Sequence, residues 1–552
     1  MTAQASIRPY LNQAYLLGLL MVAVGLTLSP FVMGMSQFWL VLVWLVDCFV
    51  PCPPFKGVPE GWGIRTKLSR FWHNKAAVLL VAFYLMHVVG LFWTSDFDYA
   101  LRDLRVKLHI LVMPFVLSSM EPLDRKRFNL VMLVYVLSVF VATQVSFFTY
   151  LRHDYDDIRE ISRFISHIRF CLNIVFSMAV VGYYIVKMRV PKGKGVPAFG
   201  VKTVVNQFLM WFLLFWFAYQ IYIFESLSGY VILAAVAIVT ADYAFLRWQK
   251  GRGWRIAIAA LAIAAVVAGS LVVWHEMKPL LKVEPVDFAT LEKKTAQGND
   301  YWHDTVHNPV EDGRYVGLYY CRKELQETWP QRSDVALTDT AANGAMLEAT
   351  LARYLTSKGL RKDAQGVMAL TEEDVRNIEQ GVANYNNWQH PGLRARLSST
   401  LFEYGLYRKY NNPNGGSLSQ RIEFTRASFH LIGQHPWFGV GTGDVPQAFS
   451  QAYDEIHSPL AEEYRFRAHN QYLAIAVAFG LVGLAFFLFV LLYPWLASRK
   501  NHTYLYTVFL CIMLLSMFPE DTLETQAGTM LFAFFTALLL FAVPQKRMDV
   551  NQ

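Results

Sequence analysis

Stretches of about 20 predominantly apolar residues recur along this chain, and each is long enough to cross a hydrocarbon layer about 30 Å thick. Of the 552 residues, 54% are hydrophobic and 17% are charged, whereas soluble domains carry about 25% charged residues. A soluble enzyme, a disordered chain and a secreted disulfide scaffold are therefore excluded. Since open strands cannot cross lipid, the sequence predicts an all-α polytopic membrane protein.

About twelve spans are predicted from the positions of these apolar stretches. They lie at 13–33, 36–50, 76–95, 106–120, 128–150, 168–188, 204–224, 227–247, 254–274, 470–495, 503–518 and 525–544. The first has no small-residue cleavage site and is longer than the apolar part of a signal peptide, so it is predicted to be a retained helix.

The charges between the spans predict an orientation. Each even-numbered connection is basic, as in Arg125, Lys126 and Arg127, whereas odd-numbered connections are mixed or acidic, as in Asp96 and Asp98. Because basic loops stay in the cytoplasm, both termini are placed there. The net charge of +8 is thus an orientation signal, and without a basic face carrying interleaved aromatics no nucleic-acid partner is predicted.

A polar segment from about 275 to 469 separates the ninth and tenth predicted spans on the extracytoplasmic side. A connection of this length is a domain or a functional element, so the chain is divided into 1–274, 275–469 and 470–552. Thr371–Asp374 resembles a capping box that opens a helix. The run 411–416, which is rich in Asn and Gly, predicts a turn or hinge.

The run from Gln434 to Asp444 contains glycines at alternate positions, Gly439, Gly441 and Gly443. Such glycines indicate an unusual backbone that approaches another group closely. Two interpretations stay open for this run. It forms a tight turn that re-enters the membrane, or its N–H groups form a nest that holds an anion.

His469 and Asn470 stand where the tenth span begins. His469 either lies at the headgroup level as an interfacial residue or takes a proton from a hydroxyl. Asn470 either orients His469 or caps the helix. Arg421 and Arg169 share the same predicted membrane face, where an arginine either snorkels to the headgroups or grips a phosphate or diphosphate. Metal-ligand spacing is missing on this face, and the cysteines form no CxxC pair, so neither a metal nor a cofactor is predicted.

These motifs together resemble the O-antigen ligase and polymerase family of bacterial envelope glycosyltransferases. The resemblance is carried by Arg421 before a helix, His-Pro-Trp-Phe-Gly-Val-Gly-Thr-Gly at 435–443, Ala-His-Asn-Gln-Tyr-Leu at 468–473 and Phe-Gly-Leu-Val-Gly at 479–483. The segment 90–96 before Leu104 and Lys107, and the large loop before the histidine-bearing span, are similar too.

The resemblance implies a metal-independent, inverting glycosyltransferase with a GT-C-like fold in the bacterial inner membrane, its active site facing the periplasm. The donor would be a glycan on undecaprenyl diphosphate, and the acceptor would be a hydroxyl of the lipid A core. The implied catalytic residues are His469 and Arg421. Substrate-binding roles are expected for the residues Arg169, Arg467, Gly439, Gly441, Gly443 and Asn470.

One departure from the family pattern concerns a second arginine. The family usually carries a Ser-Arg pair at the start of a mid-chain span, but here the matching stretch 225–230 reads Glu-Ser-Leu-Ser-Gly-Tyr. Arg169 is the candidate substitute. The alternatives left open are an O-antigen polymerase, a protein O-oligosaccharyltransferase and, from a different class, a transporter of lipid-linked sugars.

Overall fold

The computed structural model describes residues 2–50, 63–152, 158–188, 201–248, 252–283, 285–498 and 501–543. The predicted cytoplasmic connections at 51–62, 189–200 and 499–500 lie outside these residues. The chain forms two compact units, described here separately. Unit 1 contains 1–258, 424–456 and 466–552, and unit 2 contains 259–423 and 457–465.

The long helices broadly follow the hydropathy pattern, and each of the twelve predicted spans overlaps a helix, although several boundaries differ. These helices are α1 (Thr2–Leu28), α2 (Pro30–Asp47), α4 (Lys75–Val89), α5 (Phe97–Ser119), α6 (Arg125–Arg152), α7 (His167–Met188), α8 (Val201–Ile223), α9 (Leu227–Trp248), α10 (Arg252–Leu281), α19 (Gln471–Leu496), α20 (Tyr504–Ser516) and α21 (Gln526–Phe541). Unit 1 also contains α3 (Gly63–His73) and α18 (Val445–Glu455).

Within the described residues, six helices are long and apolar enough to cross a membrane, namely those at Ile7–Leu28, Pro30–Asp47, Lys75–Trp93, Arg125–Arg152, His167–Val186 and Gln471–Leu496. Three shorter apolar helices lie at Leu227–Tyr243, Tyr504–Ser516 and Gln526–Phe541. The chain is therefore an all-α, multi-pass membrane protein. The full count of twelve spans and the GT-C-like fold stay predictions.

The boundary between the first two helices differs from the predicted one. The span predicted at 13–33 runs across a break, because α1 ends at Leu28 and α2 begins at Pro30. Ser29 caps α2 by accepting the N–H of Val32 at 3.3 Å. Proline is well suited to the first helical position, where no N–H is needed. Hydropathy alone could not place this break at Ser29, since the residues on both sides of it are apolar.

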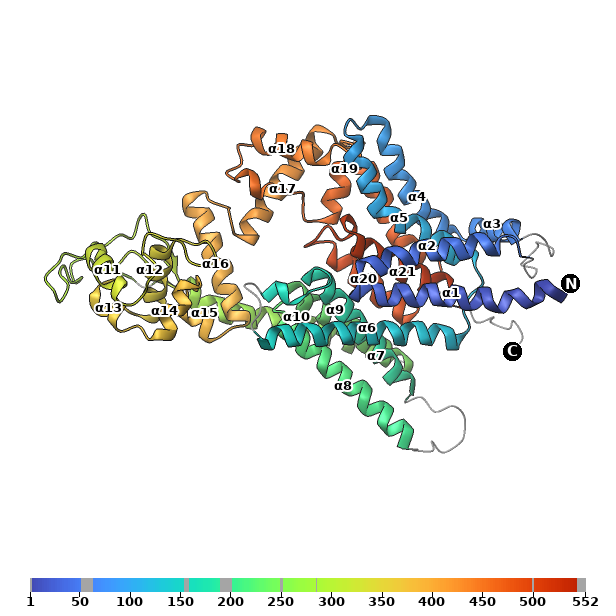
Figure 1. Cartoon of the computed structure of the whole chain (residues 1–552), viewed down its shortest axis with the longest axis horizontal. Helices are drawn as coiled ribbons and strands as arrows, with labels where there is room; N and C mark the ends of the chain where they lie inside the picture. The colour runs from blue at the N-terminus through green and yellow to red at the C-terminus, as the bar shows by residue number, and fades with distance from the viewer. Residues whose placement is uncertain are drawn as a thin grey trace. The chain divides into compact units, whose positions relative to one another are not determined.

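Helix α21 forms the centre of unit 1. Its residues from Gly528 to Phe541 are all buried, as expected of a helix that is apolar on every side. It packs along α5, while α20 packs against α7 and α9, and α1 packs against α2 and α6 (Figure 1). The loop that joins α20 to α21 is consequently held next to the first turns of α5 and α19.

Unit 2 contains short helices around one hydrophobic core. Its elements are α11 (Arg322–Thr328), α12 (Leu347–Lys358), α13 (Ala364–Met368), α14 (Glu372–Glu379), α15 (Tyr385–Gln389), α16 (Leu393–Tyr410) and the antiparallel pair β1 (Val310–Glu311) and β2 (Arg314–Tyr315). Trp329, Tyr354 and Leu355 are fully buried in the core. Figure 1 shows α11 to α15 gathered together in this unit.

Two local predictions in unit 2 are confirmed. The Thr371 hydroxyl accepts the N–H of Asp374, and the Asp374 carboxylate accepts the N–H of Thr371, so the capping box is complete. Val375 and Ile378 follow on the buried face of α14. The predicted turn lies between Tyr410, where α16 ends, and Ser417, where α17 (Ser417–Gln434) begins.

Candidate active site

The glycine-rich run packs against a break in α19. Gly480 has a φ of 66°, which interrupts the helix and leaves carbonyl groups without their usual helical partners. The N–H groups of Val440 and Gly441 donate to the carbonyls of Val477 and Ala478, both at 2.9 Å. A Cβ on Gly439 would lie 2.4 Å from the Ala478 carbonyl carbon. Only glycine permits this approach, and Gly439 itself has a φ of 67°.

The other side of the same run contacts the segment 90–96, which the sequence had also singled out. The Thr442 hydroxyl donates to the carbonyl of His87 at 2.7 Å, and the N–H of Gly443 donates to the Thr94 hydroxyl at 3.1 Å. The Asp444 carboxylate accepts the N–H groups of Ser95 and Asp96. These bonds hold the first turn of α5 against the glycine-rich run.

The N–H groups of Gly439, Gly441 and Gly443 thus all donate to groups of the protein. The observed geometry is that of the tight turn, the first of the two interpretations that the sequence left open. In this arrangement the glycines position the neighbouring helices. A direct substrate-binding role for the three glycines stays a prediction.

Helix α5 carries three polar side chains toward the centre of unit 1. Tyr99, Asp103 and Lys107 are four residues apart and therefore lie on one helical face. The Lys107 ammonium group is fully buried and contacts the carboxylates of Asp103 and Glu524, the latter at 2.7 Å. A buried lysine without such partners would be costly. The pair with Glu524 joins residues 417 positions apart in the chain.

Glu520, Asp521 and Glu524 lie in the loop between α20 and α21. Gln471, the first residue of α19, holds this loop in place. Its side-chain amide donates to Glu524 at 3.1 Å, and its side-chain oxygen accepts the N–H of Leu523 at 2.6 Å. These hydrogen bonds fix the loop against the first turn of α19. We call Glu520, Asp521 and Glu524 the acidic loop.

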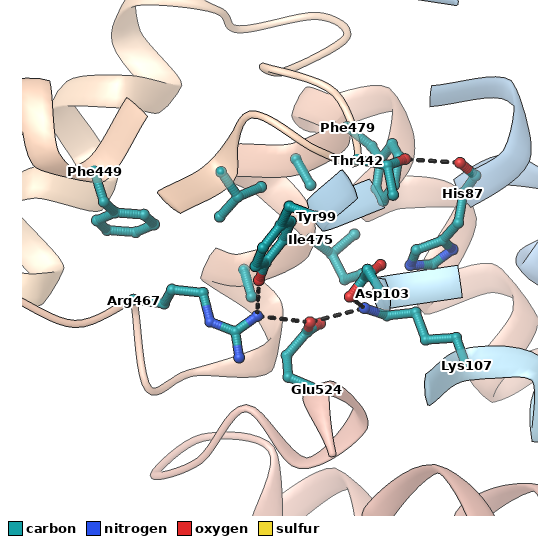
Figure 2. Close-up of a pocket in the computed structure, with 13 residues that line it drawn as sticks. His87, Tyr99, Asp103, Lys107, Thr442, Phe449, Arg467, Ile475, Phe479 and Glu524 are labelled. Carbon is teal, nitrogen blue, oxygen red and sulfur yellow. Dashed lines mark hydrogen bonds and ion pairs between the residues drawn. The ribbon is translucent and has the colours of Figure 1, made fainter. Parts of the chain in front are cut away.

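Arg467 reaches the acidic loop from the other side (Figure 2). Its guanidinium donates to the Tyr99 hydroxyl at 2.8 Å and to Glu524 at 3.0 Å, and it lies 3.6 Å from Asp521. Burial lowers the pKa of Arg467, but Glu524, Tyr99 and Asp521 outweigh this and raise the pKa overall. Arg467 is therefore permanently charged.

The carboxylates of the loop respond differently to burial. Burial raises the pKa of Glu524, but Lys107 and Arg467 outweigh it and hold that pKa well below its ordinary value. Burial raises the pKa of Asp521, and Arg467 offsets this only in part. The loop thus contains one firmly ionised carboxylate and one that is easier to protonate.

His469 lies directly before α19 with a φ of 44°, a left-handed conformation that is rare for a residue with a side chain. Its ring stacks on Phe424 with centroids 5.4 Å apart, and its Nδ1 lies 3.9 Å from an oxygen of Glu520. Strained conformations of this kind gather at functional sites. The side chain is 34% exposed, so it is accessible to a substrate although its ring is held by stacking on Phe424.

Asn470 has the capping role that was one of its two predicted alternatives. Its side-chain oxygen accepts the N–H of Leu473 at 3.0 Å, and its amide donates to the carbonyl of Phe518 at 2.9 Å. Both bonds fix the start of α19 relative to the acidic loop. Asn470 therefore positions its neighbour His469 through the backbone.

Arg169 begins α7 and points to the same acidic loop. Its Nη2 lies 3.9 Å from both Glu520 and Asp521, and its Nη1 donates to the Ser166 hydroxyl at 2.8 Å. Its Nε is buried and has no hydrogen-bond partner among the described residues. At 3.9 Å the two carboxylates attract the guanidinium without saturating its donors.

The neighbourhood of Arg169 bears on the missing arginine of the family pattern. His167 contacts the carbonyl of Phe224 at 2.8 Å, and a Cβ on Gly229 would lie 3.7 Å from Cys171. The start of α7 therefore packs against the stretch 225–230, where the family usually has its Ser-Arg pair. That Arg169 substitutes for the absent arginine stays a prediction.

The structure thus brings three of the predicted residues, His469, Arg169 and Arg467, to one acidic loop. Arg421 lies on α17 three residues before Phe424, the residue that stacks on His469, but it belongs to unit 2. Its role stays a prediction. No site role was predicted from the sequence for Tyr99, Asp103, Lys107, Gln471 or the acidic loop. A lysine at membrane depth requires a partner, so Lys107 is the signal in the sequence that could have indicated an acidic residue nearby.

His469, Glu520 and Asp521 also form the group of metal-type ligands found within the described residues, with ligand atoms within 4.8 Å of one another. The same carboxylates already face the guanidinium groups of Arg169 and Arg467. Two positive charges beside these oxygens oppose the entry of a cation. The prediction of a metal-free site is thus open to a direct test.

Residues 393–488, from α16 to the middle of α19, match a protein-family model described as O-antigen ligase. This match confirms the resemblance seen in the sequence, and residues 393–488 are thus similar to the O-antigen ligase family. It includes Arg421, the glycine-rich run and His469, whereas Arg169 and the acidic loop lie outside it. No curated protein matches the chain. The family indicates a ligase or polymerase type of glycosyltransferase in lipopolysaccharide biosynthesis.

Proposed function

We propose that this protein transfers a glycan from undecaprenyl diphosphate to a hydroxyl of the lipid A core at the periplasmic face of the inner membrane. The observation that carries this proposal is the meeting of His469, Arg169 and Arg467 at the acidic loop. One group that can accept a proton and two that can bind a diphosphate are the parts that such a transfer needs.

The acceptor hydroxyl attacks the anomeric carbon of the donor while the bond from that carbon to the diphosphate oxygen breaks. Attack opposite the leaving group inverts the anomeric configuration. His469 takes the hydroxyl proton through Nε2, because its Nδ1 faces Glu520. The Glu520 carboxylate, 3.9 Å from Nδ1, stabilises by its negative charge the imidazolium that forms.

Arg169 and Arg467 bind the leaving diphosphate. A guanidinium presents paired donors that match phosphate oxygens, and such contacts lower the barrier when negative charge develops on the leaving group. For Arg421, the diphosphate-binding role that the family resemblance implies is kept as part of the proposal. The acidic loop holds the side chains of Arg169 and Arg467 in place when no donor is bound. Less conformational entropy of these long side chains is therefore lost when the donor binds.

The test is transfer by the purified protein in detergent, with lipid-linked donor and lipid A core as acceptor. His469→Ala is expected to lower the rate by a factor of about 100 or more, the range for a general base. His430→Ala is a matched control, because His430 is 33% exposed and also faces a glutamate, Glu455, at 2.7 Å. A normal rate in His469→Ala contradicts the mechanism.

Surface polysaccharide from a deletion strain separates the alternatives. Loss of attachment with normal glycan length indicates a ligase, and a single repeat unit on the core indicates a polymerase. Intact lipopolysaccharide together with the loss of a glycoprotein indicates protein glycosylation. A transporter forms no product in detergent, where no compartments exist.

A further inference from the structure

Unit 2 contains a large polar hollow far along the chain from His469. It has a volume of about 1010 Å³, counting the solvent that it opens to. The lining residues are Pro279, Leu280, Glu311, Asp312, Arg314, Thr356, Ser357, Asn386, Asn387, His390, Arg394 and Ala395. Apart from Arg394 and Ala395, they precede the part of the chain that matches the family. The hollow is thus built mainly by residues to which nothing above gives a role.

One wall is formed by the hairpin of β1 and β2. Its two-residue turn, Asp312-Gly313, has positive φ angles of 50° and 79°, the conformation that Asp-Gly favours in such turns. A Cβ on Gly313 would lie 2.3 Å from the carbonyl oxygen of Lys282. The glycine therefore lets the end of α10, with Pro279 and Leu280, close this side of the hollow.

The acidic groups of this wall are held rigidly. Arg353 donates to both oxygens of Glu311, at 2.8 and 2.7 Å, and so neutralises that buried carboxylate. The Asn384 amide bridges Glu311 and Asp312 at 3.0 and 2.9 Å. The Ser398 hydroxyl donates to the other oxygen of Asp312 at 2.5 Å. Polar groups that are fixed before a ligand arrives lose little entropy on binding.

The opposite wall joins the end of α12 to α15. The Ser357 hydroxyl accepts the N–H of Tyr385 at 2.8 Å, and the Ser357 carbonyl accepts the Asn386 amide at 3.0 Å. The Asn387 amide donates to the Ser398 hydroxyl at 3.2 Å. These bonds orient the two asparagines at the rim and tie α15 to both of its neighbours.

Three of the lining residues, Arg314, His390 and Arg394, carry basic side chains. His390 and Arg394 are exposed, and neither side chain forms a hydrogen bond within the described part of the chain. Arg314 lies beside them and donates to the carbonyl of Thr356 at 3.4 Å. The hollow therefore combines carboxylate and amide oxygens with guanidinium and imidazole donors.

The chemistry of the lining selects the class of ligand. A mainly apolar ligand would cover the His390 and Arg394 side chains without offering them a hydrogen-bond partner. A bare phosphate would meet the Asp312 carboxylate inside the hollow. A sugar hydroxyl, by contrast, both donates and accepts, so neighbouring hydroxyls can bind Asp312 and Asn387 while an acidic substituent binds Arg394.

We propose that this hollow is a carbohydrate-binding site that holds a distal segment of the glycan. That this glycan belongs to the donor rests on the function proposed above, but the binding of sugar does not. The site retains the polymer on the extracytoplasmic unit. It therefore favours long glycans over a single repeat unit without taking part in the bond exchange.

The experiment measures binding of lipid-free glycan, released by mild acid from the surface polysaccharide of the source strain, to the full chain in nanodiscs by calorimetry. Arg394→Ala removes a basic side chain of the lining, and Ala395→Trp fills the hollow. Both are expected to weaken glycan binding about tenfold or more, the scale of one lost charged contact. Arg376→Ala, an exposed arginine on α14 outside the hollow, is the matched control and is expected to bind normally.

In the transfer assay, both hollow variants are expected to raise KM for long donors and to leave kcat and the use of single-repeat donors unchanged. Unchanged glycan binding in both variants overturns the proposal, as does displacement of the glycan by millimolar inorganic phosphate. His469→Ala is expected to bind glycan normally. If the hollow variants lose glycan binding while His469→Ala retains full transfer, this inference stands and the proposed function fails.

Discussion

Asp374 in unit 2 and the pair Glu520 and Asp521 in unit 1 are buried carboxylates that are compensated in different ways. In unit 2, Asp374 accepts hydrogen bonds from Tyr354 at 2.6 Å and from the N–H of Thr371 at 2.8 Å, and it pairs with Lys358. In unit 1, Glu520 and Asp521 face Arg169 at 3.9 Å, beyond hydrogen-bonding distance. A carboxylate whose hydrogen-bonding capacity is filled by the protein stabilises the fold. When a carboxylate and a guanidinium lie beyond hydrogen-bonding distance, the guanidinium keeps donors available to a substrate.

The pKa values express the same contrast. Burial raises the pKa of Asp374, but Lys358, Tyr354 and Thr371 outweigh burial and lower the pKa to about 2. Burial raises the pKa of Asp521, and its more distant cations do not reverse the shift. A carboxylate whose pKa is lowered stabilises the folded state at neutral pH, and one whose pKa is raised does not. The ionised form of Asp521 is thus retained at a cost in stability, which is typical of a functional site.

The largest effect is expected when a cation of the acidic loop is removed. Arg467→Ala and Arg169→Ala should lower transfer by a factor of about 100 or more, because each removes a contact to developing negative charge. Arg169→Lys should restore the rate only in part, since an ammonium group lacks the paired donors. Initial rates with purified variants measure this. Rates within twofold of the wild type for both alanine variants would show that the contrast between the units has no bearing on catalysis.

A cation of unit 2 should behave in the opposite way. Lys358→Met leaves Asp374 buried without its ion pair and should lower the free energy of unfolding by about 2–3 kcal/mol, somewhat less than for a fully buried pair because Lys358 is partly exposed. Transfer by the folded fraction should stay within twofold. Thermal unfolding in detergent and the specific activity of the folded protein test this. A large loss of kcat without loss of stability would contradict it.

The capping carboxylate predicts a pH dependence in unit 2. Because its folded pKa is about 2, below the ordinary 3.8, Asp374 adds stability that is complete above about pH 4 and is lost as the pH falls toward 2. The shift corresponds to about 2 kcal/mol. The protection of α12 and α14 against hydrogen exchange, measured relative to the intrinsic exchange rate at each pH, should fall over this interval in the wild type. In Asp374→Asn the protection should already be low at pH 5 and change little with further acidification, and equal pH profiles of protection for the two proteins would disprove the assignment.

The smallest effect is expected from removing divalent metal. Since the guanidinium groups of Arg169 and Arg467 already supply positive charge at the acidic loop, transfer in excess chelator should stay within twofold. The assay above measures this directly. A loss of activity that magnesium or manganese restores would show instead that His469, Glu520 and Asp521 bind a metal ion.

Much of the fold could be predicted because its signals are local. Apolar stretches marked the position of each long helix, and Thr371 with Asp374 marked the start of α14. The break at Gly480 within α19 was not predicted, because a helix that is apolar throughout shows no change of period there. Its cause is the glycine-rich run that packs against it.

The amino-acid sequence was enough to indicate the class of protein, the helical segments, the resemblance to the O-antigen ligase family and the candidate residues His469, Arg169 and Arg467, because hydropathy and motifs are properties of short stretches. Which residues meet could be seen only in the tertiary structure. Lys107 pairs with Glu524, and Asp444 binds the N–H of Ser95 349 positions away. The periodicity of apolar residues shows which face of a helix is apolar, but it does not show which other helix packs against that face. Only packing could therefore bring the acidic loop to the arginines and the histidine.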